Sequence, residues 1–155
     1  EENVLRIREH FMPFYEVHNA DLSRPYDGIL ELLAELKKRG LRMAVASNKF
    51  DEGTQKLVHT IFPEVAFKAV YGNKEGFPLK PDAALLHLIM EQCGATADQT
   101  YMIGDSGVDI QTAAAAGTHS IGVTWGFRDH EELLDNGAEH IVDNPEQIVE
   151  IICKE

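Results

Sequence analysis

The stretch YMIGDSGVDIQTAAAAG at residues 101–117 decides the fold. Tyr101–Gly104 is a short apolar run that ends at a glycine, which predicts a buried strand. Residues 107–116 are rich in alanine, a strong helix former, and Gly117 follows where a helix C-terminus favours glycine. A buried strand that leads directly into a helix predicts one unit of an α/β fold.

The same alternation extends over the rest of the chain. The apolar patterns predict helices at 3–18, 27–39, from Asp51 to Ile61, from Pro81 to Cys93, at 129–136 and from Pro145 onward, and strands at 42–46, 69–71, 120–124 and 140–142. Helices and strands that alternate at short spacing predict a doubly wound parallel sheet with crossover helices. The helix at 3–18 precedes this pattern and does not belong to it.

Length and composition favour one ordinary globular domain. The chain has 155 residues, of which 44% are hydrophobic and 26% charged. Its formal net charge of -12 argues against nucleic acid or an anionic membrane as partner, since both require a basic face. Cys93 and Cys153 lack ligand spacing, so we predict reduced thiols and a cytoplasmic location.

Polar side chains stand where three predicted helices follow strands or loops. Ser47 and Asn48 follow the strand at 42–46 and offer a hydroxyl and an amide to a phosphate, although both residue types are common before any helix. Lys80 precedes Pro81 and offers a point charge, but an isolated lysine there is more often a solvated cation. Ligands of open α/β sheets bind at the carboxyl ends of the strands, where these residues are expected.

The third junction carries two carboxylates. Asp105 and Asp109 follow the strand at 101–104, and Mg²⁺ prefers a few carboxylates together with water and substrate phosphate. Ser106 and Asp109 also form a capping-box pair that would begin the helix without any metal. Because all three junctions suit the same chemistry, their combination favours a phosphate–magnesium site.

Three motifs carry a family resemblance. VASNK at 45–49, LKPD at 79–82 and IGDSGVD at 103–109 resemble the second, third and fourth motifs of the haloacid dehalogenase superfamily. The longer stretches at 24–49 and 103–128 are similar to phosphoglycolate phosphatases. The resemblance implies a Rossmann-like core and a magnesium-dependent phosphatase that acts on a small phosphomonoester such as phosphoglycolate.

The resemblance also implies roles for the matching residues. Ser47 would hydrogen-bond a phosphoryl oxygen, and Asn48 would support the loop and the phosphate site. Lys80 would stabilise the charge shared by the nucleophile and the phosphoryl group. Asp105 would ligate Mg²⁺, and Asp109 would support the ion or orient Lys80.

The family's first motif, Asp-x-Asp-Gly-Thr, does not occur in residues 1–155. In the family this motif supplies the nucleophile, the general acid and base, a magnesium ligand and a central strand. We therefore expect residues 1–22 to be the end of a helical cap and residues 23–155 to be the core without its first strand. We expect this chain alone to be inactive, with the missing N-terminal segment of the same protein as its partner.

Other interpretations remain open. A non-catalytic interaction or regulatory fragment on the same scaffold would differ by having no Asp-x-Asp-Gly-Thr segment encoded ahead of Glu1. A dinucleotide-binding Rossmann domain is disfavoured because no G-x-G-x-x-G follows a strand. Trp125, Gly126 and Phe127 are predicted to serve packing and loop geometry, and the seven histidines form no ligand-spaced pair.

Overall fold

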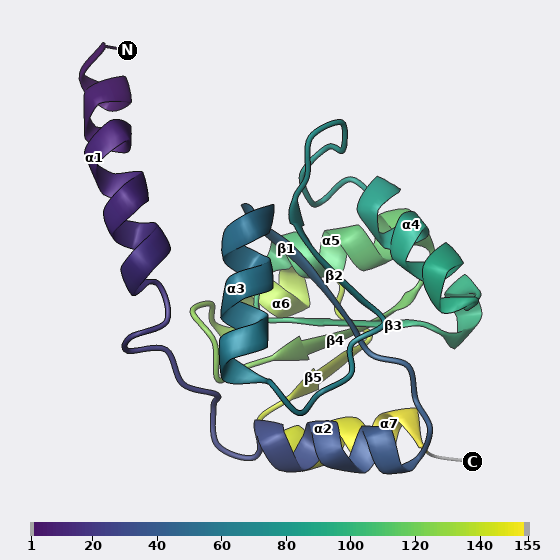
Figure 1. Cartoon of the computed structure of the whole chain (residues 1–155). Coiled ribbons are helices and arrows are strands. Elements are labelled where there is room, and N and C mark those ends of the chain that lie inside the picture. Colours follow the sequence, from purple (N-terminus) through teal and green to yellow (C-terminus); the bar gives the residue numbers. More distant parts are fainter. Residues whose placement is uncertain (1, 154–155) are drawn as a thin grey trace.

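The computed structural model describes residues 2–153, in which helices and strands alternate along the chain (Figure 1). The helices are α1 (Glu2–His18), α2 (Ile29–Lys38), α3 (Asp51–Ile61), α4 (Ala84–Cys93), the 3₁₀ turn η1 (Ala97–Gln99), α5 (Gly107–Ala116), α6 (His130–Asp135) and α7 (Pro145–Ile152). The strands are β1 (Ala44–Phe50), β2 (Ala69–Asn73), β3 (Tyr101–Gly104), β4 (His119–Val123) and β5 (His140–Val142). The order agrees with the sequence pattern, with most ends displaced by one or two residues.

All strand pairs are parallel, which confirms the predicted α/β class. The strands fall into two sheets, with the orders β1-β2 and β3-β4-β5. In the first, Ala44 pairs with Ala69; in the second, Met102 pairs with Ser120 and Gly122 with Ile141. The two strands of each neighbouring pair are thus connected by a segment that crosses over from the end of one strand to the start of the next.

The two sheets differ in how well their strands are covered. β4 has a neighbour on each side, and four of its five residues are buried. None of the seven residues of β1 is buried, and Ile103 of β3 is 36% exposed. Within residues 2–153, β1 pairs only with β2 and β3 only with β4, so one edge of each strand carries unpaired backbone groups.

Helices cover the sheets in two groups. On one side α4 contacts β1, β2 and α5, and α5 in turn contacts β3, β4 and α6. On the other side α2 and α7 lie side by side (Figure 1), and their apolar residues form one cluster with β4 and β5. Because α4 packs against elements of both sheets, it holds the two sheets in one body.

Two predicted boundaries are corrected. Pro81 does not open α4, which begins at Ala84, because the Asp82 carboxylate accepts a hydrogen bond from the Ala84 N–H at 2.8 Å and closes a turn first. β1 begins at Ala44 and continues through Phe50, so the polar residues predicted to follow it lie within its last part. The N-terminus of α5 has the predicted capping box of Ser106 and Asp109, and that of α7 has a second box, formed by Asn144 and Gln147.

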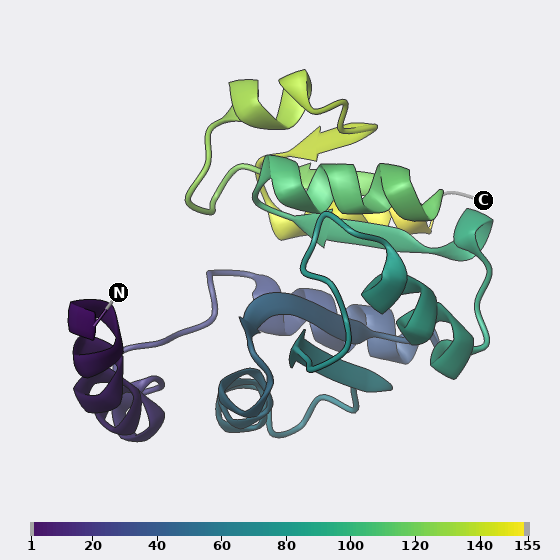
Figure 2. The ribbon, with the colours of Figure 1, turned by 90° about the horizontal axis from the view of Figure 1, so that it is seen from above.

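Helix α1 contains Pro13 and lies beside the α/β body on the side of α3 (Figures 1 and 2). Several of its apolar side chains are more than half exposed: Val4, Ile7, Phe11, Phe14 and Val17. No helix among residues 2–153 is long and apolar enough to cross a membrane. That residues 1–22 are the end of a cap stays a prediction.

Candidate active site

Two of the predicted site residues, Asn48 and Asp109, contact Lys80, which lies in the loop before α4. The amide of Asn48 donates from Nδ2 to the Lys80 carbonyl oxygen at 3.0 Å. In return, the backbone N–H of Lys80 donates to Asn48 Oδ1 at 2.8 Å. This reciprocal pair fixes the backbone of Lys80 to the end of β1 across 32 positions of sequence.

The ammonium group of Lys80 reaches in the opposite direction. It donates to Asp109 Oδ1 at 2.6 Å and to the carbonyl oxygen of Ala46 at 3.1 Å. The side chains of Lys80 and Asp109 are only 11% and 8% exposed. An ammonium group has three N–H donors, so one remains for a further acceptor.

Both carboxylate oxygens of Asp109 accept hydrogen bonds from other groups of the protein. Its second oxygen, Oδ2, accepts from the Ser106 hydroxyl at 2.7 Å and the Ser106 N–H at 3.2 Å. A Cβ at Gly104 would lie 2.3 Å from the Asp109 carboxyl carbon, so only glycine fits beneath this carboxylate. Asp109 therefore forms the predicted pair with Ser106 at the start of α5 and also pairs with Lys80, through different oxygens.

Asp105, between β3 and α5, has a different environment. Its Oδ2 accepts from the Phe127 N–H at 2.9 Å, whereas no residue among 2–153 donates to Oδ1. A Cβ at Gly126 would lie 2.2 Å from the Asp105 Cβ, so the loop after β4 approaches the carboxylate closely. Asp105 is half-buried and retains one free carboxylate oxygen, the kind of ligand that Mg²⁺ takes.

The described residues contain no complete metal centre. No group of three or more histidine, cysteine or acidic side chains between residues 2 and 153 is arranged to hold a metal ion. Asp105 therefore fits Mg²⁺ as one ligand among others, whereas the contacts of Asp109 favour the alternative role of orienting Lys80.

Ser47 keeps a hydrogen-bond donor. Its Oγ accepts the Lys49 N–H at 3.1 Å, and its own hydroxyl hydrogen stays available for another acceptor. The Lys49 ammonium donates to the hydroxyl of Tyr15 on α1 and lies 4.2 Å from the centroid of that ring. The sequence places Lys49 beside Ser47 and Asn48 but did not predict its contact with Tyr15, since no local signal links residues 34 positions apart.

The loop after β4 was predicted to serve packing. Trp125 does pack against the core cluster of α2, β4, β5 and α7, but the side chain of Phe127 is 93% exposed. Among the histidines, His119 hydrogen-bonds Glu139 at 2.7 Å, and this bond raises the pKa of the imidazole. In this loop, Gly126 lies close to the Asp105 side chain, and the backbone N–H of Phe127 donates to it.

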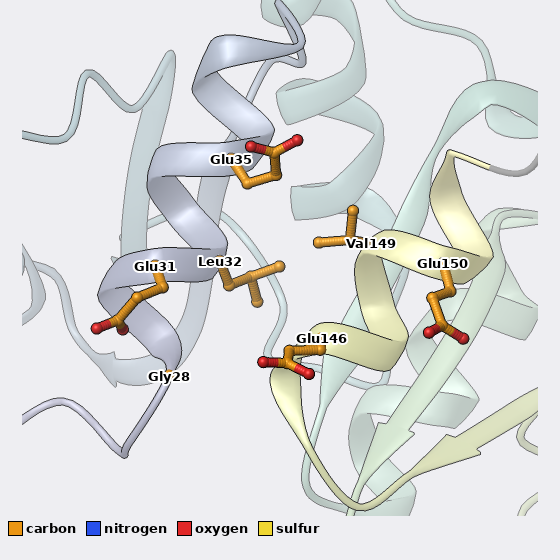
Figure 3. A pocket seen from close by; sticks show the side chains of 7 residues that line it. All are labelled: Gly28, Glu31, Leu32, Glu35, Glu146, Val149 and Glu150. Atoms are coloured by element: carbon orange, nitrogen blue, oxygen red, sulfur yellow. The ribbon is translucent and has the colours of Figure 1, made fainter.

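One cavity of the described residues lies away from these side chains. A groove of about 660 Å³ runs between α2 and α7, lined by Gly28, Leu32, Val149 and the glutamates at 31, 35, 146 and 150 (Figure 3). None of the predicted site residues lines it. Four carboxylates disfavour a phosphate there, so this groove is not the site predicted from the motifs.

Comparison with known families agrees with the motifs. A family model described as haloacid dehalogenase-like hydrolase matches residues 1–123. An N-acetylmuramic acid 6-phosphate phosphatase of Pseudomonas aeruginosa is 32% identical over 147 residues, which are 94% of this chain and 65% of the relative. A phosphoglycolate phosphatase of Mesorhizobium japonicum is 32% identical over 124 residues, covering 80% of this chain and 55% of the relative.

Solved structures give the same result. A crystal structure from Lactobacillus delbrueckii subsp. bulgaricus, assigned as a phosphoglycolate phosphatase, superposes with a TM-score of 0.91 at 38% identity. The match covers 98% of this chain and 63% of that one. The chain thus spans about two thirds of the length of the relatives that it matches over nearly its whole length, and the predicted resemblance is confirmed.

Proposed function

Because this chain belongs to the haloacid dehalogenase-like hydrolases, we propose that it forms the larger part of a magnesium-dependent phosphatase. The proposed substrate is a small phosphomonoester of the phosphoglycolate type. The observation that carries the proposal is the arrangement of Lys80, which is fixed by Asn48, paired with Asp109 and left with one free N–H donor. A phosphatase needs such a fixed cation, since phosphoryl transfer depends mainly on positioning and charge neutralisation.

Each residue then has a defined task. The free hydroxyl hydrogen of Ser47 and the remaining N–H of Lys80 donate to phosphoryl oxygens, and their fixed positions orient the ester. Asn48 and Asp109 act through Lys80, the first on its backbone and the second on its ammonium. Asp105 would hold Mg²⁺ through its open oxygen; when bound, the ion neutralises phosphoryl charge and orients the group.

The nucleophile is proposed to lie outside residues 1–155. Asp109 is a poor candidate because donors engage both of its oxygens, and Asp105 is proposed as a metal ligand. The unpaired edges of β1 and β3 supply backbone donors and acceptors for an added strand. A strand that carries the family's aspartate between them would end close to Lys80, whose ammonium already reaches Ala46 on β1.

The resemblance implies a two-step reaction on that aspartate. Its carboxylate attacks phosphorus, a new P–O bond forms as the ester P–O bond breaks, and the leaving alcohol takes a proton from the general acid. Water then attacks phosphorus as the aspartyl P–O bond breaks, and it gives its proton to the same group, now acting as base; this step releases inorganic phosphate and restores the free aspartate. Lys80 neutralises charge in both steps.

Phosphate release from phosphoglycolate with Mg²⁺ tests the proposal. We compare residues 1–155, verified by intact mass, with the complete enzyme, in which the segment that carries the nucleophile is joined to them. The expected result is turnover by the complete enzyme and none by residues 1–155. Turnover by residues 1–155 alone would mean that another residue of this chain is the nucleophile.

If the complete enzyme hydrolyses neither phosphoglycolate nor other phosphomonoesters, the proposed activity is wrong and a non-catalytic role on the same scaffold is favoured. A cytoplasmic location stays a proposal that rests on cysteine usage; Cys93 and Cys153 are both free and partly buried.

A further inference from the structure

Glu132, on helix α6, binds the start of helix α5 directly after the proposed magnesium ligand Asp105. Its Oε1 accepts a hydrogen bond from the backbone N–H of Gly107 at 2.9 Å. Gly107 is the first residue of α5, so this N–H is one of those for which the helix itself has no acceptor. The carboxylate also suits the positive end of the helix dipole, and the contact fixes the chain that follows Asp105.

Helix α6 approaches the start of α5 closely. A Cβ at Gly107 would lie 2.4 Å from Asn136 Nδ2, so any larger residue would collide with the end of α6. The Asn136 amide is itself held in place, because it donates to the carbonyl oxygen of Glu132 at 2.8 Å and accepts from Gln111 at 2.6 Å. Within this packing, Glu132 is the residue that hydrogen-bonds the chain next to Asp105.

The loop on the other side of Asp105 leads into the same helix. Oδ2 of Asp105 accepts from the N–H of Phe127, and α6 begins shortly afterwards at His130. Arg128 lies 3.7 Å from Glu132, but the two side chains are 60% and 36% exposed, so this pair contributes little. Both segments that flank Asp105 are therefore tied to α6, the loop by chain continuity and α5 through Glu132.

A carboxylate at a helix N-terminus often serves only to stabilise the helix. Helix α5 already has a complete capping box of Ser106 and Asp109, so its start is satisfied without Glu132. What distinguishes Glu132 is its place between the two segments that determine how Asp105 is oriented.

We propose that Glu132 is a positioning residue of the magnesium site. By holding the Gly107 N–H, it keeps Asp105 in the orientation in which Phe127 binds one carboxylate oxygen and the other is free for the ion. Glu132 acts through the backbone and does not bind the metal. This inference rests on the proposed function for the role of Asp105, and it makes magnesium affinity depend on a residue of α6.

Magnesium binding followed by nuclear magnetic resonance tests the inference without turnover. Mg²⁺ is titrated into the isotope-labelled complete enzyme, and its Kd is taken from the amide shifts of Gly107 and Phe127. Amide exchange at Phe127 is measured in the absence of Mg²⁺. The variants are Glu132→Asp, which keeps the charge but is one methylene shorter, and Glu132→Gln, which loses the charge but keeps an oxygen that can accept from Gly107.

Glu132→Asp is expected to raise the Kd of Mg²⁺ about tenfold, the lower end of what residues that support metal ligands cost. It should also speed amide exchange at Phe127, because Asp105 is then held less firmly. Glu132→Gln should bind Mg²⁺ nearly as well as the unchanged enzyme. Glu131→Asp is the matched control, since Glu131 is the neighbouring exposed glutamate of α6, and it should change neither quantity.

An unchanged Kd for Glu132→Asp would overturn the inference without touching the proposed activity, which phosphate release measures separately. A Kd raised by Glu132→Gln but not by Glu132→Asp would show that only the charge matters, and would overturn it as well. If Mg²⁺ shifts neither amide in any of these proteins, the inference falls with the metal assignment. Weaker Mg²⁺ binding by Glu132→Asp in an enzyme that hydrolyses no phosphomonoester would support the positioning role and refute the proposed activity.

Discussion

The buried pair of Lys80 and Asp109 allows a quantitative test of the site. The perturbation is a double-mutant cycle of Lys80→Met, Asp109→Asn and the combined variant, in the complete enzyme. Removing one partner of a buried ion pair costs about 3–5 kcal/mol, because the other charge is left uncompensated. Each residue keeps some contacts, Asp109 with Ser106 and Lys80 with Ala46, so the lower figure applies.

The combined variant leaves neither charge uncompensated and should cost less than the sum. With about 3 kcal/mol for each single variant and a coupling of about 2 kcal/mol, within the usual range for contacting residues, the expected cost is about 4 rather than 6 kcal/mol. The low exposure of the two side chains, 11% and 8%, is the reason to expect a coupling this large.

Urea unfolding followed by circular dichroism measures all four proteins. Glu35→Gln is the matched control: Glu35 also contacts its cation, Arg39, at 2.7 Å, but the two side chains are 32% and 45% exposed, so the urea midpoint should not change. Additive costs of the single variants at Lys80 and Asp109 would refute the idea that this pair is a desolvated unit that fixes the ammonium.

Three further outcomes are expected. Asp105→Asn should remove most magnesium-dependent turnover of the complete enzyme and leave its circular dichroism unchanged; full activity at saturating Mg²⁺ would exclude Asp105 as a ligand. In residues 1–155 alone, amides of β1 and β3 should exchange rapidly because each strand has an unpaired edge, and strong protection in both would contradict this. Glu139 raises the pKa of His119, so their contact stabilises the fold below the ordinary value of about 6.5 and is lost as pH rises through the folded value. Glu139→Gln should thus lower the melting midpoint slightly near about pH 5.5 and leave it unchanged near about pH 9.

Sequence patterns predicted the elements well where local chemistry decides them. The strand at 101–104 and the helix at 107–116 have the predicted ends, because the glycines at 104 and 117 and the Ser106–Asp109 box set those ends locally. The start of α4 was wrong because a turn closed by Asp82 competes with helix initiation at Pro81. Proline at a first helical position is a preference that a neighbouring side chain can override.

The sequence proposed the members of the candidate site but not their contacts. Ser47, Asn48, Lys80, Asp105 and Asp109 were found because polar residues at the ends of parallel strands meet on one side of a sheet. Sequence reasoning could not predict that the amide of Asn48 hydrogen-bonds the backbone of Lys80, since this contact depends on how two loops approach each other. The contact of Tyr15 with Lys49 depends likewise on where α1 packs.

The strongly negative chain raises the question of how it would attract an anion at all. The acidic residues are not evenly spread: four glutamates line the groove between α2 and α7, and none of the site residues borders that groove (Figure 3). At the site, the Asp109 carboxylate offsets the charge of Lys80 and leaves it one N–H donor, and Lys49 forms no ion pair with a carboxylate whose side chain the structure describes. Because exposed charges more than about 8 Å away are largely screened at physiological ionic strength, the local field is set by the two lysines together with Asp105 and Asp109, whose charges offset one another. Lowering the salt concentration should therefore weaken anion binding, since the repulsion of the distant glutamates is then screened less; binding that strengthens at low salt would refute this account.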